Sequence, residues 1–205
     1  MLTYRELDEA FALTTMADEV LTDLRTGSNI QHSLTALLRQ SIYIRLAGYD
    51  DTNDAERLSI DPVMRQVVGG RAVDHHAAST SQMARFETKV LTQPTNLSAL
   101  IDLPGKWVDC VCQTKPIKKL ILDLDSSVSE TYGQQEGSQY NGHFGCECYH
   151  PLFCFNQDGD VEGEVLRNGN VASVHDWPVV LVPVVERYRD LDIRKLFRGD
   201  AAFAI

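Results

Sequence analysis

The chain has 205 residues, 43% of them apolar, and its 19 Lys and Arg stand against 29 Asp and Glu, a formal net charge of −10. This apolar fraction excludes a wholly disordered chain, and the length allows one large domain or two small ones. The sequence has no run of about 20 apolar residues that could span a membrane, and the acidic first residues do not resemble a signal peptide. We therefore expect a cytoplasmic protein without a membrane partner, and at first sight its acidity argues against nucleic acid.

The first half of the chain shows apolar residues at helical spacing. Polar and glycine-containing segments separate these stretches, as is typical of loops between helices. An interruption at Pro104 is left open because proline cannot donate a helical hydrogen bond. The predicted helices cover residues 4–24, 34–46, 55–58, 62–68 and 96–112.

One further short helix carries a second, polar face. Ser79 and Gln82 have the spacing of a capping box, which predicts a helix start. The apolar side chains of Met83, Phe86 and Val90 would form its buried face. Gln82, Arg85 and Lys89 fall on another face, where they could contact DNA phosphates or base edges. The alternative is an ordinary solvated face. Residues 71–120 are the only net basic block of the chain, at +3, which favours the DNA interpretation.

After Pro116 the pattern changes to short strands. Strands are predicted over residues 118–125, 149–155 and 161–166, followed by a helix over 178–188 capped by Asp176 and a fourth strand over 193–197. Pro183 predicts a kink or a later start of that helix. Three strands joined by hairpins predict an antiparallel meander, and a strand that returns after a helix adds a parallel edge. The sequence therefore predicts an α+β protein.

The strongest chemical feature is a pair of carboxylates at the end of the first strand. Asp123 and Asp125 are two residues apart, so both side chains project from one face of the strand. Unpartnered burial of two charges is costly, which favours a divalent metal as their partner. Asp200 follows the fourth strand, and if the two strands are neighbours it lies beside Asp125. Converging carboxylates can hold two metal ions for phosphodiester chemistry. The alternative is a solvent-exposed strand end.

The order and spacing of several motifs resemble the DDE transposases of bacterial insertion sequences, the group with GQQEG and RGD-x-x-F segments. The similar segments are Ile121–Asp125, Gly133–Gly137, Tyr140–Gly142, Pro151–Phe153, Arg167–Asn170 and Phe197–Phe203, with His32–Arg39, Gly48–Asp54 and Ser81–Glu87 in the helical half.

This resemblance implies a helical DNA-binding domain over residues 1–115, followed by a partial RNase H-like catalytic domain over 116–205. It implies Mg²⁺ or Mn²⁺ as the cofactor and the double-stranded DNA of transposon ends as the partner, and it allows a homodimer. The catalytic and metal-binding residues would be Asp125, favoured over Asp123, and Asp200. The family's third residue, a Glu in a Tyr-x-x-Arg-x-x-x-Glu motif, has no match here. We therefore expect a truncated transposase that is inactive alone.

Two other functions remain open. A haloacid-dehalogenase-like phosphatase also begins with an apolar strand and Asp-x-Asp, in which Asp123 would be the nucleophile and Asp125 the general acid. That fold requires alternating strands and helices after the motif, whereas this sequence predicts hairpins. The other alternative is a non-catalytic fragment that binds DNA through its helical half.

Overall fold

The structure, a computed structural model, describes residues 1–26, 29–114, 116–133, 135–199 and 203. The chain divides into two compact units, Met1–Leu103 and Pro104–Ile205, and the division falls inside one long helix. The domain boundary expected after residue 115 stays a prediction. Among the described helices, none is both long enough and apolar enough to cross a membrane.

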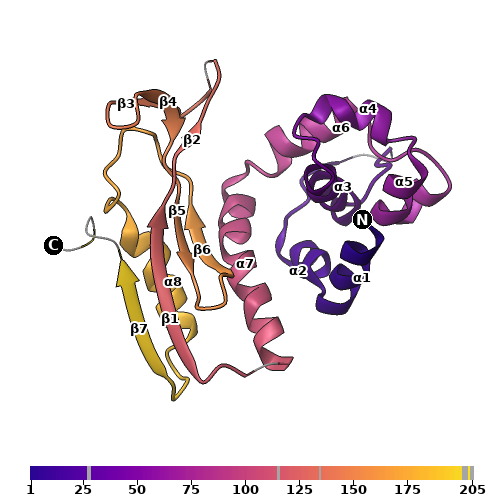
Figure 1. Cartoon of the computed structure of the whole chain (residues 1–205). Helices are drawn as coiled ribbons and strands as arrows, with labels where there is room; N and C mark the ends of the chain where they lie inside the picture. The colour runs from indigo at the N-terminus through magenta and orange to yellow at the C-terminus, as the bar shows by residue number, and fades with distance from the viewer. Residues whose placement is uncertain (27–28, 115, 134, 200–202, 204–205) are drawn as a thin grey trace. The chain divides into compact units, whose positions relative to one another are not determined.

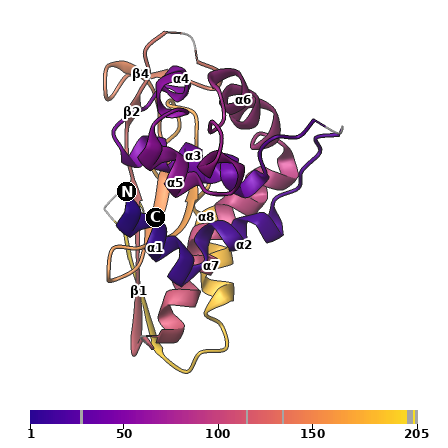
Figure 2. The same cartoon turned by 90° about the vertical axis from the view of Figure 1, so that its right-hand side faces the viewer.

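The first unit is helical, as predicted (Figure 2). Its elements are α1 (Leu2–Phe11), α2 (Leu13–Val20), α3 (Leu34–Leu46), η1 (Thr52–Asp54), α4 (Ala55–Leu58), α5 (Pro62–Val68), η2 (Gly70–Val73), α6 (Thr80–Arg85), η3 (Phe86–Val90) and the first part of α7 (Pro94–Thr114).

The single helix expected over residues 4–24 is two helices. Ala12 lies between α1 and α2 with a left-handed φ of 58°. Asp8 stabilises the break, because its carboxylate accepts hydrogen bonds from the Thr14 backbone N (2.8 Å) and hydroxyl (2.6 Å). The guanidinium of Arg39 on α3 also donates to Asp8, at 3.2 Å. A buried carboxylate with several partners outweighs the cost of one strained residue, and the apolar spacing alone did not reveal it.

A buried side chain on α3 positions the start of α6. The Gln40 side chain, fully buried, donates to the Ala78 carbonyl O (2.7 Å) and accepts from the Ala78 N (2.8 Å). Ser79 follows directly, and its capping box with Gln82 is present as predicted. The predicted apolar face of Met83, Phe86 and Val90 is buried. The α-helix ends at Arg85 and continues as a π-helix, η3, which sequence spacing did not predict.

The second unit contains a four-stranded mixed sheet with the order β6-β5-β1-β7 (Figure 1). Its strands are β1 (Lys119–Ser126), β5 (Leu152–Phe155), β6 (Val161–Val165) and β7 (Arg194–Gly199). β1, β5 and β6 pair antiparallel, and β7 joins β1 in parallel after helix α8 (Trp177–Arg187). This arrangement confirms the predicted meander with a parallel edge strand, and with it the α+β class.

Helix α8 covers one face of this sheet. Leu120, Leu122 and Leu124 of β1 form a buried cluster with Val180 and Val184 of α8. The helix passes through Pro183 without a later start. Proline removes the hydrogen bond to the carbonyl four residues earlier, and Val179, which carries that carbonyl, is 58% exposed, so water can replace the bond.

A second, small sheet is inserted between β1 and β5. It has the order β2-β4-β3, from β2 (Ser129–Glu130), β3 (Gln139–Asn141) and β4 (Cys146–Tyr149). The single strand expected over residues 149–155 is therefore wrong: it comprises the end of β4 and all of β5, divided at Pro151. Proline cannot donate to a strand ladder, so it marks the point where the chain leaves one sheet for the other.

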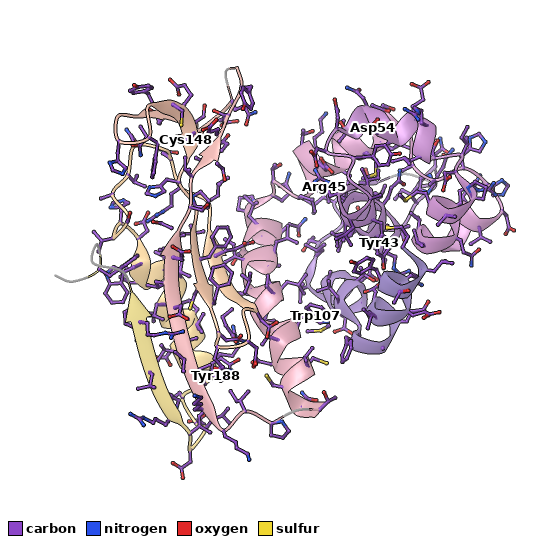
Figure 3. The ribbon with its side chains drawn as sticks, in the orientation of Figure 1. Tyr43, Arg45, Asp54, Trp107, Cys148 and Tyr188 are labelled. Carbon is purple, nitrogen blue, oxygen red and sulfur yellow. The ribbon has the colours of Figure 1, made fainter. Side chains whose placement is uncertain are left out.

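A buried polar cluster connects α7, α8 and β6. The Glu162 carboxylate accepts hydrogen bonds from the Tyr188 hydroxyl (2.9 Å) and the Asn156 amide (2.9 Å), and it pairs with Arg187. Arg187 also contacts Asp109 on α7, at 2.9 Å. Tyr188, the residue after α8, is labelled in Figure 3. Burial raises the pKa of the Tyr188 hydroxyl, which therefore stays protonated as a donor.

Candidate functional site

The two predicted carboxylates lie on the face of β1 opposite α8. The leucines of β1 at 120, 122 and 124 are buried, whereas Asp123 is half-buried and Asp125 is exposed. The strand alternation therefore separates a core face from an acidic face, as the sequence predicted. Asp125 lies near the carboxyl end of β1, where the chain leaves the sheet.

The parallel register of β1 and β7 brings Gly199 of β7 beside Leu124 of β1. The pairing runs from Lys119 opposite Arg194 to Leu124 opposite Gly199. Asp125 follows Leu124 in the sequence, and Asp200 follows Gly199. Asp200 itself lies outside the described residues, so the structure gives no position for its carboxylate.

Asp123 has a partner that sequence spacing did not suggest. The Arg198 guanidinium on β7 donates two hydrogen bonds to its carboxylate, at 2.6 and 2.5 Å. This bidentate contact raises the pKa of Arg198 further above its ordinary value. Because the pair already occupies both oxygens of Asp123, Asp125 is the more available of the two carboxylates for a metal ion.

One more carboxylate shares this face of the sheet. Asp125 pairs with Phe153 on β5, and Phe153 pairs with Glu164 on β6, so the three residues form one row. Neighbouring strands are about 4.8 Å apart, which places Glu164 roughly 10 Å from Asp125. Burial raises the pKa of Glu164. No group of three His, Cys, Asp or Glu side chains is arranged to hold a metal within the ranges that the structure describes.

The candidate DNA-contacting residues occupy the exposed side of α6 and η3. Arg85 and Lys89 are exposed, and Gln82 is half-buried. The Gln82 carbonyl O of the side chain accepts from the Ser79 backbone N, at 2.8 Å, so Gln82 is held by the capping box. Its amide N lies 3.4 Å from the Gln31 side-chain O. The three predicted residues thus come together on one side, although the π-helix changes the spacing of Lys89.

Two hollows lie against this side of the helix. The first, about 670 Å³, is lined by Arg65 and Arg71 together with Gln82 and Arg85. The second, about 640 Å³, is lined by Arg25 and Lys89 together with Gln82 and Arg85. Gln31 and His32 also line both. The two hollows therefore adjoin each other along α6 and η3, and we call the combined feature the trough.

Sequence spacing alone did not place the other residues of the trough beside Arg85. Arg65 and Arg71 come from α5 and η2, and His32 comes from the segment before α3. His32 belongs to a segment that resembles the transposases and Arg71 to the net basic block, but neither signal placed them beside Arg85. His32 is buried, and this burial, together with the charges of Arg71 and Arg25, lowers its pKa. Only the packing of distant segments around α6 shows that these side chains share one surface with Arg85.

The topology does not favour the phosphatase alternative. After β1 the described chain forms hairpin strands, and its first sheet helix, α8, follows only after β6. Comparison with curated proteins gives no match, and comparison with solved structures gives none either. A family model described as Transposase DDE domain group 1 matches residues 1–205. The chain therefore belongs to the DDE transposases, a family whose members move DNA segments.

Proposed function

We propose that the acidic face of β1 takes part in DNA strand cleavage and strand transfer at transposon ends. Asp125 and Asp200 would be the metal ligands, with Mg²⁺ or Mn²⁺ as the cofactor. The observation that carries this proposal is the parallel β1–β7 register, which runs as far as Leu124 opposite Gly199. Each proposed ligand is the next residue in the sequence after one member of this pair.

The donor set fits the proposed cofactor. Carboxylate oxygens are hard ligands that suit Mg²⁺ and Mn²⁺, and Asp125 is exposed at a strand end. When bound, such ions lower the pKa of a water or 3′-hydroxyl and stabilise the leaving oxygen of a phosphodiester. Asp125 would hold its ligand oxygens on a rigid strand. The Asp123–Arg198 pair would fix the strand edge beside it without competing for the metal.

The third member of the family's catalytic set has no match in this sequence. The resemblance implies a Glu in a Tyr-x-x-Arg-x-x-x-Glu motif, and this sequence contains no such motif. Glu164 lies on the same face, but two strands away from Asp125. We therefore propose that this chain by itself binds metal weakly and does not cleave DNA.

The helical unit would supply DNA binding. Arg85 and Lys89 are exposed cations on one side of α6 and η3, and Gln82 lies beside them with an amide N that can donate a hydrogen bond. Such a combination suits phosphate contacts from the cations and a base-edge contact from the amide.

The metal site is tested by measuring Mn²⁺ binding to the full chain. Electron paramagnetic resonance detects this binding as a loss of the free-ion signal. Asp125→Asn removes one ligand charge and should weaken binding by about tenfold or more. Asp123→Asn is the matched control, because Asp123 is engaged by Arg198, and it should change affinity far less. Equal affinity of the wild-type chain and Asp125→Asn would refute the proposed ligand.

A further inference from the structure

The positive charges of the helical unit are concentrated in the trough. Residues 1–103 contain nine Lys and Arg against fourteen Asp and Glu, so this unit is acidic as a whole. Five of those nine cations line the trough: Arg25, Arg65, Arg71, Arg85 and Lys89. Asp74 is the single carboxylate among the lining residues of the two hollows. An acidic unit that gathers its cations on one hollowed surface is organised for an anionic partner.

Among the described residues, most of these cations have no carboxylate partner. Arg65 donates to the Ala72 and Val73 carbonyl oxygens, at 2.8 and 2.6 Å, which are neutral groups. Arg85 donates to the Ser81 carbonyl O, also neutral, at 3.0 Å. Arg25 is the exception, because Asp23 pairs with it at 2.7 Å. The hydrogen bond from Arg25 lowers the pKa of the Asp23 carboxyl.

Three of the four arginines of this unit that lie outside the trough form ion pairs with carboxylates. Arg5 and Arg39 pair with Asp8, and Arg45 of α3, labelled in Figure 3, pairs with Glu87 at 2.8 Å. The Arg39 and Arg45 contacts connect α3 with α1 and η3, whereas Arg5 and Asp8 both lie on α1. Among the described residues, these three arginines are thus engaged with carboxylates, whereas Arg65 and Arg85 of the trough donate to neutral carbonyl groups.

The uncompensated cations are spread along the length of the trough. Arg65 and Arg71 line the first hollow, Lys89 lines the second, and Arg85 lines both. The α6–η3 wall from Thr80 to Val90 rises about 1.5 Å per residue, so the trough follows it for roughly 16 Å. Phosphates on one DNA strand advance about 3.4 Å along the axis of a duplex. The trough is thus long enough for several successive phosphates.

We propose that the sugar–phosphate backbone of one DNA strand lies lengthwise in the trough, bound by Arg65 and Arg71 at one end, Arg85 in the middle and Lys89 at the other end. This inference rests on the proposed DNA binding and extends it from one helix face to a surface built from three distant segments. Gln31, His32 and Gln82, which line both hollows, would face the bound strand with neutral polar groups.

The test measures DNA affinity of the full chain by fluorescence anisotropy at several salt concentrations, on duplex and single-stranded oligonucleotides. Each phosphate contact contributes about −0.9 to the slope of log K against log salt for a duplex. Arg71→Ala should therefore reduce the slope by about 0.9, and Arg71→Ala with Lys89→Ala by about 1.8. A loss of one contact changes the affinity ratio between 50 and 200 mM salt by roughly 3.5-fold.

Two further variants provide controls. Arg57→Ala removes the same charge from an exposed site on α4 that does not line the trough, and it should leave the slope unchanged. Asp74→Asn removes the lining carboxylate and should strengthen DNA binding, an effect of opposite sign that misfolding would not produce. An unchanged slope for Arg71→Ala, with a reduced slope for Lys89→Ala and Arg85→Ala, would overturn the trough but keep the helix face as the DNA contact.

The two proposals fail in different ways. No DNA binding by the wild-type chain would refute both the proposed DNA binding and the trough. Binding with an equal loss for Arg57→Ala and Arg71→Ala would show a diffuse charge effect and refute the trough alone. The duplex and single-stranded probes show whether the bound backbone belongs to double-stranded or to single-stranded DNA. A reduced salt slope for Arg71→Ala with either probe supports the trough. Binding of an acidic peptide but not of either DNA would refute it.

Discussion

Replacement of Glu162 by Ala should strongly destabilise the sheet-containing unit. The Glu162 side chain is completely buried and has Arg187, Tyr188 and Asn156 as partners. Its removal leaves the Arg187 guanidinium, which is 20% exposed, and the buried Tyr188 hydroxyl without this carboxylate partner. Breaking a buried ion pair on one side costs about 3–5 kcal/mol. Asp109 still contacts Arg187, so we expect the lower end of that range, about 3 kcal/mol.

The measurement is urea unfolding followed by tryptophan fluorescence. Both tryptophans, Trp107 and Trp177, lie in the unit Pro104–Ile205, so the signal reports on that unit. For an m-value of about 1–3 kcal/mol per molar urea, a loss of about 3 kcal/mol lowers the midpoint by roughly 1–3 M.

A matched control uses an exposed glutamate on the same helix. Glu186 pairs with Arg189, and both side chains are about half exposed. Exposed pairs contribute at most about 1 kcal/mol, so Glu186→Ala should change the midpoint little. Equal midpoints for Glu162→Ala and the wild-type chain would refute the reasoning, because they would mean that the buried cluster contributes no net stability.

Two more predictions concern single positions. Burial and the nearby charges of Arg71 and Arg25 lower the pKa of His32. As the pH falls through about 6.5, the unfolded chain takes up a proton before the folded chain does, so the stability of the fold should decrease. In thermal melts followed by circular dichroism, His32→Gln should show a flatter pH dependence of stability. A Cβ on Gly169 would come within 2.3 Å of the Cys148 carbonyl O, so Gly169→Ala should lower the free energy of unfolding in urea by about 1–3 kcal/mol. Gly142→Ala is the control and should cost far less, because no atom lies within 4 Å of a Cβ at that position. Equal unfolding midpoints for the two variants would contradict the close approach at Gly169.

Sequence patterns predicted the elements whose periodicity is set by one buried face. The leucines of β1, the Met83, Phe86 and Val90 face, and the capping box of Ser79 and Gln82 depend only on neighbours within one strand or helix. The parallel pairing of β7 with β1 was also predictable, because a helix between two strands permits it.

The features that the sequence did not reveal depend on residues far apart in the chain. The break at Ala12 is stabilised by Asp8, whose other partner, Arg39, is 31 residues away. The Asp123–Arg198 pair joins residues 75 positions apart, and it underlies the proposal that Asp125 rather than Asp123 is the metal ligand. The trough likewise requires α5, η2 and the segment before α3 to pack around α6. No local period records such contacts, so they could be found only in the folded unit.

The proposed trough would explain how an acidic protein binds DNA. The net charge of this chain sets a long-range repulsion of DNA, which physiological salt largely screens beyond the Debye length of about 8 Å. Within that distance the side chains on one surface dominate, and on the trough uncompensated cations outnumber the one carboxylate. We therefore expect DNA association to be slow at low salt for so acidic a chain, and its affinity to depend on a few named contacts. A single substitution such as Asp74→Asn should consequently affect DNA affinity far more than an equal charge change elsewhere on the helical unit.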